Sequence, residues 1–262
     1  MNDANYSRRD VVSTVALASA SLVASYAINA RSAPAGNAPA AAASKGGDKH
    51  APLSAVLTGN HTVVPLPFVA STLNGISDRM ITSHHDNNYA GAVKNLNSVE
   101  QELAKITNDT PAFLVAALRE KELTFRNSKT LHEAYFSNLG GNGKRSGAIE
   151  GALNQGYGST ARWEEHFRAT GMGLGGGSGW VILDYELDTG ALRTVASGNH
   201  TQVLANGYPL LVLDMYEHAY QMDFGAGAAK YIDAFFANVK WEEVNRRLER
   251  AQRAFAILKA KA

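Results

Sequence analysis

Cysteine is absent from this 262-residue chain. Disulfides, thiolate zinc sites and iron–sulfur clusters are therefore excluded, and any bound metal must be held by histidine or carboxylate side chains. An excess of charge of one sign is also missing, because 25 Lys and Arg stand against 24 Asp and Glu for a net charge of +1. Without a long basic block, nucleic acid has no electrostatic reason to bind. We expect a globular protein.

A strongly apolar run of membrane-spanning length is missing at the N-terminus. The stretch after Arg8 and Arg9 is rich in Ser, Ala and Thr, whereas a permanent span needs roughly 20 strongly apolar residues. This pattern favours a cleaved signal peptide of the twin-arginine type over an uncleaved anchor. We predict a signal over residues 1–35, export to the periplasm or the exterior, and no membrane attachment after cleavage.

The next part of the chain changes from low complexity to helical periodicity. Residues 36–52 consist mainly of Ala, Pro, Gly and Ser without apolar periodicity, which predicts a disordered linker. From Gly75 to about Ile106 apolar residues recur at helical spacing, and a second helical pattern follows Pro111. These patterns predict a long antiparallel helical hairpin over residues 53–140.

The C-terminal half has a mixed pattern that begins after a Gly-rich loop. Two short helices are expected first, the second capped by Ser159 or Thr160. The segment WVILDYELDTGALRTVASG then predicts a β-hairpin, and YPLLVLDMY predicts a third strand buried on both faces. Two helices close the chain. We therefore predict an α/β region over residues 145–260 with a small three-stranded antiparallel sheet, and an α+β fold with a ligand site between the halves.

The third strand runs into the segment DMYEHAY, which has metal-ligand spacing. If the chain bends into a helix there, Asp214 and His218 face a common point while Glu217 turns away. A bare carboxylate at the end of a buried strand is unfavourable without a cation. Asp214 could instead cap the following helix.

Two of the eight histidines lie on the inward face of the predicted hairpin. His84 is on the first helix and His132 on the second, although a lone inward histidine is more often a core residue than a ligand. His85 lies about 100° around the helix from His84, so the two cannot share one ion. Three further histidines are expected to be solvated or at the surface: His50, His61 and His166.

Three stretches together resemble one known family. DMYEHAYQMDFGAGAAKYIDAFFANVKWEEV is similar to the C-terminal signature of the iron/manganese superoxide dismutases, and GMGLGGGSGW to the strand entry before it. SHHDNNYAGAVKNLN and LHEAYFSNL resemble the two ligand helices. The resemblance covers about residues 60 to 258. It implies dismutation of superoxide at one iron or manganese ion per chain, with four protein ligands: His84, His132, Asp214 and His218.

The resemblance also implies residues that surround the metal. His200 falls where the family commonly has a glutamine that hydrogen-bonds the metal's solvent ligand, and a histidine can donate the same bond. Trp180 matches a family tryptophan, whereas Tyr216 stands where the family usually has another. The family's gateway His and Tyr fall on Asn88 and Ala92.

Two further residues bear on the gateway and on assembly. Tyr89 lies about 140° from His84 on a regular helix, so it is not an easy substitute for the missing gateway pair. Glu217 and Tyr220 follow the family pattern and imply a homodimer. In that arrangement Glu217 would orient His218 of the partner subunit.

Three other interpretations remain open at this point. Two histidines and one carboxylate are also the facial set of non-haem iron oxygenases, which would need only three of the four ligands. A closed tetrahedral zinc site is conceivable, but zinc has no accessible redox change. The missing gateway pair also allows a catalytically silent homologue that the metal merely stabilises.

Overall fold

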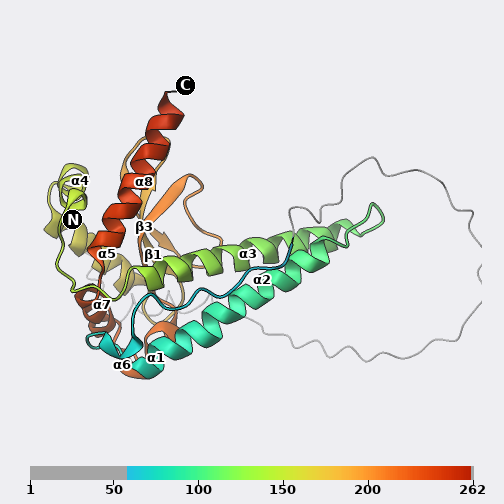
Figure 1. Cartoon of the computed structure of the whole chain (residues 1–262), viewed down its shortest axis with the longest axis horizontal. Coiled ribbons are helices and arrows are strands. Elements are labelled where there is room, and N and C mark those ends of the chain that lie inside the picture. The colour runs from blue at the N-terminus through green and yellow to red at the C-terminus, as the bar shows by residue number, and fades with distance from the viewer. Residues whose placement is uncertain (1–57, 261–262) are drawn as a thin grey trace, which may run out of the picture. The chain divides into compact units, whose positions relative to one another are not determined.

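The structure is a computed structural model that describes residues 58–260 (Figure 1). The predicted signal peptide (1–35) and linker (36–52) lie outside the described residues, as do residues 53–57 of the predicted hairpin region. Within the described part, no helix is long and apolar enough to cross a membrane. The elements follow the order η2 (Ala70–Thr72), α1 (Asp78–Ser83), η3 (His84–Tyr89), α2 (Ala90–Leu103), α3 (Ala112–Ser137), α4 (Ala148–Tyr157), α5 (Thr160–Leu174), β1 (Trp180–Glu186), β2 (Leu192–Ser197), β3 (Gly207–Asp214), η4 (Glu217–Ala219), α6 (Gln221–Phe224), α7 (Ala228–Ala237) and α8 (Trp241–Lys259).

The first long helix is made of α1, η3 and α2 in direct succession. Ser77 caps it, because its hydroxyl accepts a hydrogen bond of 3.0 Å from the Met80 amide. The segment η3 is π-helical rather than α-helical. Such segments are often found at functional sites, and they change which side chains share a helix face. The regular spacing assumed from the sequence therefore fails between His84 and Tyr89.

The second long helix, α3, lies beside α2 and forms the expected antiparallel hairpin (Figure 1). Asn138, at the C-terminal end of α3, is completely buried. Its side-chain oxygen accepts a hydrogen bond of 2.9 Å from the amide of Val212 in β3. This contact fixes the end of the hairpin against the sheet, which determines where a side chain one or two turns earlier on α3 can reach.

The three strands form one antiparallel sheet in the order β2-β1-β3. Trp180, the first residue of β1, is paired with Asp214, the last residue of β3. Residues 210–214 of β3 are all buried, as the apolar run predicted. The fold class predicted from the sequence is thus confirmed: a helical hairpin followed by an α/β part with a three-stranded antiparallel sheet.

The short helices were harder to predict. The cap of α5 is confirmed as Ser159, whose hydroxyl accepts a hydrogen bond of 3.1 Å from the Arg162 amide. The helices η2, η4 and α6 were not predicted as separate elements. Each has at most four residues, and such a length is too short to show helical periodicity in a sequence.

Candidate metal centre

Four side chains from four different elements converge where the hairpin meets the sheet. His84 lies on η3, His132 on α3, Asp214 at the end of β3 and His218 on η4. One potential ligand atom from each lies within 4.8 Å of all the others. The Oδ2 atom of Asp214 is 3.1 Å from Nε2 of His84, 3.7 Å from Nε2 of His132 and 3.4 Å from Nε2 of His218.

These separations fit the ligands of a single ion. Ligand atoms bound at about 2.1 Å from one metal lie roughly 3 to 4 Å apart. The Nε2 atoms of His132 and His218 are buried and have no hydrogen-bond partner among the described residues. Buried polar atoms are rarely left unpaired, so lone pairs gathered around one point indicate a cation between them.

Asp214 faces the other clustered side chains and does not cap the helix that follows, because the N-cap residue of η4 is Tyr216. Its Oδ1 atom accepts a hydrogen bond of 2.8 Å from the Tyr216 amide, which closes an Asx-type turn after β3. Its Oδ2 atom faces the three imidazoles. Burial raises the pKa of Asp214, but the neighbouring imidazoles of His218 and His84 outweigh this effect and hold the pKa below its ordinary value. The residue is therefore a carboxylate anion.

Two of the clustered histidines, His84 and His132, are held in the neutral form that metal binding requires. Burial lowers the pKa of His84 and, together with the charge of His84, lowers the pKa of His132 to about 3. Nδ1 of His132 donates a hydrogen bond of 2.7 Å to the carbonyl oxygen of Ser128, one turn earlier on α3. This bond places the proton on Nδ1 and leaves the lone pair of Nε2 directed at the site.

Ser128 is a positioning residue that the sequence interpretation missed. The contact is made by the main-chain oxygen of Ser128, which a residue of any type at this position would provide, so the identity of the residue gave no signal in the sequence. Tyr231 was also missed. Its hydroxyl donates a hydrogen bond of 2.9 Å to the carbonyl oxygen of Asp214 and so fixes the backbone at the end of β3.

An aromatic layer lies beside the four ligands. The indole Nε1 of Trp180 donates a hydrogen bond of 3.0 Å to Nδ1 of His200. The neutral His200 ring consequently carries its proton on Nε2. The ring of Tyr216 is stacked between His200 and His218, with centroid distances of 4.9 Å and 5.4 Å. Burial raises the pKa of Tyr216 to about 12, so its phenol stays protonated.

The surroundings of the predicted gateway positions differ from those expected for a regular helix. Asn88 is half-buried and Ala92 is buried. Tyr89 is 1% exposed, and its ring centroid lies 6.1 Å from that of His132. Its hydroxyl donates to Glu133 at 2.7 Å and accepts from the Val64 amide at 2.9 Å. The 140° separation from His84 does not hold, because the intervening turn is π-helical.

The residues expected at a dimer contact have contrasting environments. Glu217 is exposed, and the side chain of His218 next to it is 28% exposed. Tyr220 is 1% exposed, and its hydroxyl accepts a hydrogen bond of 3.0 Å from the Gly176 amide. The ring of Tyr220 stacks on Tyr231 within the same chain at 5.2 Å.

The other histidines in the described part of the chain lie outside the cluster. His85 is buried, with Nε2 2.8 Å from the Val64 carbonyl oxygen, and His166 is exposed. The prediction that His61 is solvated was wrong. Its Nε2 lies 2.9 Å from the buried Glu100 carboxylate. His61 and Glu100 are far apart in the sequence, so no local sequence pattern could predict their contact. His50 lies outside the described residues.

Comparison with known proteins gives one consistent result. A family model described as iron/manganese superoxide dismutases, C-terminal domain, matches residues 145–247. A protein of Cupriavidus metallidurans named superoxide dismutase [Fe] is 45% identical over 190 residues, which is 72% of this chain and 96% of that protein. A protein of Halobacterium salinarum named superoxide dismutase [Mn] 1 is 32% identical over 196 residues, covering 73% of this chain and 96% of that protein.

The chain belongs to the iron/manganese superoxide dismutase family. A protein of Aquifex pyrophilus named superoxide dismutase [Fe] is a further relative, 32% identical over 198 residues, or 71% of this chain and 91% of that protein. Apart from the relative at 45% identity, the relative named for iron and the relative named for manganese are equally similar to this chain, each at 32% identity. The similarity does not choose between iron and manganese.

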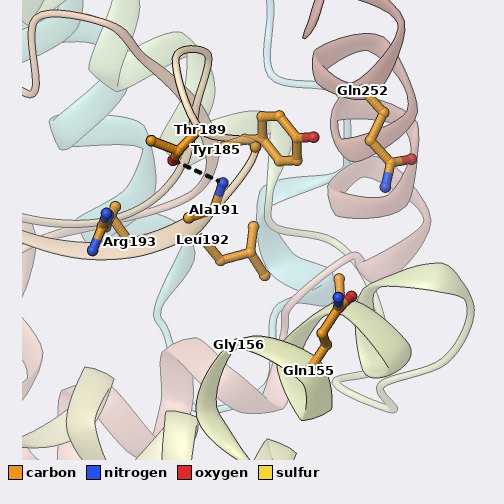
Figure 2. Close-up of a pocket in the computed structure, with 10 residues that line it drawn as sticks. Gln155, Gly156, Tyr185, Thr189, Ala191, Leu192, Arg193 and Gln252 are labelled. Carbon is orange, nitrogen blue, oxygen red and sulfur yellow. Dashed lines mark hydrogen bonds between the residues drawn. The ribbon is translucent and has the colours of Figure 1, made fainter. Parts of the chain in front are cut away.

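The cluster of His84, His132, Asp214 and His218 is separate from a cavity at the opposite end of β1. Figure 2 shows Gln155, Gln252 and the ring of Tyr185 around this cavity, which lies between α4, α8 and the β1–β2 hairpin and has a volume of about 470 Å³. None of the four clustered side chains lines it. Among the described residues that line it, the charged one is Arg193, which is paired with Glu186 at 2.9 Å.

Proposed function

We propose that this chain is a superoxide dismutase with one iron or manganese ion per chain. The observation that carries the proposal is the arrangement of three imidazole Nε2 atoms around one oxygen of a fully buried carboxylate. Three imidazoles and one carboxylate suit a metal of intermediate hardness. Four residues would hold the ion: His84, His132, Asp214 and His218.

The bound ion would supply the one-electron exchange by which one superoxide is oxidised to O₂ and a second, with two protons, is reduced to H₂O₂. The chain provides the electrostatics. Asp214 contributes a single negative charge, and the burial of His84 and His132 keeps both imidazoles neutral. The loaded site would therefore keep a positive charge, which favours an anionic substrate.

His200 would hold a proton at the edge of this site. Its tautomer follows from the hydrogen bond that Nδ1 accepts from Trp180, so Nε2–H is a donor. Its carbonyl oxygen accepts a hydrogen bond of 2.7 Å from the Asn127 side chain, which fixes the loop that carries it. Partners of this kind beyond the ligands tune a metal site. We propose that His200 donates a hydrogen bond to solvent or substrate in the site.

We also propose a homodimer in an exported protein. An exposed glutamate beside a partly exposed ligand supports the dimer, because the resemblance predicts that Glu217 reaches His218 of the partner subunit. The Arg8 and Arg9 pair with its weakly apolar flank supports twin-arginine export to the periplasm or exterior. Sedimentation of the purified protein and fractionation of cells that produce the full chain would test these two points.

The function is tested by loading the purified protein separately with iron and with manganese. We expect one ion per chain and catalytic removal of superoxide with at least one of them. One ion per chain without activity with either metal would favour the silent homologue, to which the Asn88 and Ala92 positions lend support. A His84→Ala variant that keeps its metal and oxidises an organic substrate would favour the oxygenase instead.

A further inference from the structure

A second cavity lies between α3, β1 and the segment that joins β2 to β3. Its volume is about 210 Å³. Asp184 of β1 is a lining residue, and every other lining residue is uncharged. The polar lining side chains besides Asp184 are Asn127 and Thr130, both on α3. The remaining walls are aliphatic or backbone: Leu131, Ile182, Val203, Leu204, Ala205, Gly207 and Pro209.

Asp184 is a buried carboxyl group without a partner. The residue is 2% exposed, and its Oδ1 atom is buried without a hydrogen-bond partner among residues 58–260. Gly207 lies against the carboxyl group so closely that a Cβ atom at that position would stand 2.8 Å from the Asp184 Cγ atom. A side chain at position 207 would collide with the carboxyl group, whereas glycine allows the carboxyl group to lie directly against the backbone.

The basic side chain nearest in the sheet does not neutralise this carboxyl group. Arg193 is the cross-strand neighbour of Asp184 in β2, but its guanidinium group pairs with Glu186 at 2.9 Å. On α3, Lys129 pairs with Glu133 at 2.9 Å. Burial raises the pKa of Asp184 to about 7. A substantial fraction of the carboxyl groups is therefore ionised at neutral pH, in a place where an anion needs a cation nearby.

The rest of the lining shows which cation would fit. The side-chain nitrogen of Asn127 already donates to the His200 carbonyl oxygen at 2.7 Å, so its side-chain oxygen remains as an acceptor. The Thr130 hydroxyl is a further acceptor at the exposed rim. Calcium takes six to eight oxygen ligands and usually several carboxylates, and this cavity offers one carboxylate. Aliphatic walls also suit a hydrocarbon chain better than a bare ion.

We propose that this cavity binds a primary alkylammonium group, with the ammonium on Asp184 and a short aliphatic chain along Leu131, Ile182 and Val203. An ammonium group donates three hydrogen bonds and accepts none, which matches a lining of acceptors. No bond is made or broken, so the site is one of recognition. It is distinct from the metal cluster and does not depend on the proposed dismutase activity.

The test uses the metal-loaded full chain and n-butylammonium chloride as the probe. We expect binding of one probe per chain, with a dissociation constant on the order of 1 mM for a ligand of this size. The affinity should decrease about tenfold for each pH unit below 7 as Asp184 takes up a proton. Titration calorimetry at matched ionic strength measures both quantities. The uncharged analogue n-butanol and potassium chloride serve as comparison probes.

Two variants and one control locate the binding. Asp184→Asn should weaken n-butylammonium binding at least tenfold, and Ala205→Phe, at the exposed rim, should weaken it by blocking the cavity while leaving the charge in place. The control Asp109→Asn removes one exposed carboxylate and should bind as the parent does. Thermal unfolding shows that each variant is folded.

Four results would overturn the proposal. Equal binding by Asp184→Asn would place the probe elsewhere, and equal binding of n-butanol would show that the charge is irrelevant. Potassium binding without n-butylammonium binding would make the cavity an inorganic cation site. No heat up to about 20 mM probe would show that the cavity holds only water.

Discussion

Two aspartates of the same sheet have opposite surroundings. Asp214 at the end of β3 is 0% exposed and Asp184 in β1 is 2% exposed, so burial alone does not distinguish them. Three imidazoles and a backbone amide face Asp214, and its pKa is lowered. Asp184 has no such neighbours, and burial raises its pKa to about 7. The partners of a buried carboxyl group, rather than its depth, decide whether it is an anion and what it can bind.

The largest effect is expected from removing the negative charge of Asp214. Asp214→Asn keeps the size of the side chain but replaces the anionic oxygen that faces three imidazoles. We expect the bound metal to fall to a small fraction of one per chain, with at least a 100-fold loss of superoxide removal, since even changes beyond the ligands cost 10 to 100-fold. Elemental analysis and a superoxide assay measure these effects.

The same substitution at the other aspartate provides the contrast. Asp184→Asn should keep one metal per chain, because Asp184 is not among the clustered residues. If the two variants lose metal to the same extent, the assignment of Asp214 alone as the metal-binding carboxylate is wrong. Retention of metal by Asp214→Asn would remove the basis of the proposed site.

Removing the metal should produce the next largest effect. A ligand present at about 1,000 times its dissociation constant stabilises the folded state by roughly 4 kcal/mol. For a chain of this size that corresponds to a decrease of roughly 8 to 16 °C in Tm when a chelator strips the ion. Calorimetry with and without chelator measures the shift. Asp184→Asn should show the full shift and Asp214→Asn almost none; a full shift in Asp214→Asn would contradict the assignment.

The pH dependence of stability isolates Asp184. Its pKa is about 7 in the folded protein against 3.8 for an unperturbed carboxyl group. Between these values the folded state holds a proton that the unfolded chain has released, so the free energy of unfolding decreases as pH rises. At about 1.4 kcal/mol per unit, the parent should lose about 2 to 3 kcal/mol between pH 5 and 7 relative to Asp184→Asn.

Urea unfolding of both proteins at several pH values checks this slope. Metal release at low pH affects the parent and Asp184→Asn alike, so it cancels in the difference between them. The exposed-carboxylate control Asp109→Asn should follow the parent. A difference that stays constant from pH 5 to 8 would show that Asp184 has an ordinary pKa in the folded protein.

The two aspartates also show what a sequence can predict. Asp214 was predicted as a candidate ligand because His218 stands four residues later and a buried strand precedes it. The hairpin and the three strands were predicted because their apolar periods are long and regular. Asp184 gave no such signal. Its isolation depends on Arg193 turning to Glu186 and on Gly207 leaving space, and both are tertiary facts.

The π-helical segment marks a second limit of the sequence interpretation. Angles between His84 and Tyr89 were derived for a regular helix, and nothing local in HHDNNY indicates a wider turn. Packing determines it: the ring centroid of His84 lies 5.0 Å from that of Phe136, and Tyr89 is bonded to Glu133, both on α3. The hydrogen bond from Trp180 to His200, beside the clustered side chains, likewise joins residues whose contact cannot be predicted from their spacing in the sequence.

A smaller effect is expected at His200, which tests whether polar partners near Asp214 influence the reaction. His200→Ala removes the Nε2–H donor while leaving all four clustered side chains. We expect one metal per chain and a rate of superoxide removal about 10 to 100-fold lower. His200→Gln restores an N–H donor and should recover most of that loss. Equal activity of the Ala variant and the parent would exclude a role for this donor.

The smallest effect should come from Ser128→Ala. The main-chain oxygen of Ser128 accepts a hydrogen bond of 2.7 Å from Nδ1 of His132, whereas the hydroxyl lies farther away at 3.3 Å. The substitution removes only the hydroxyl, so the ring of His132 keeps its proton position and its orientation. We expect a change in metal affinity of less than about threefold, measured by competition with a chelator. A loss of tenfold or more would show that the Ser128 hydroxyl orients His132. The orientation of this ligand would then depend on the residue type at position 128 and not on the backbone alone.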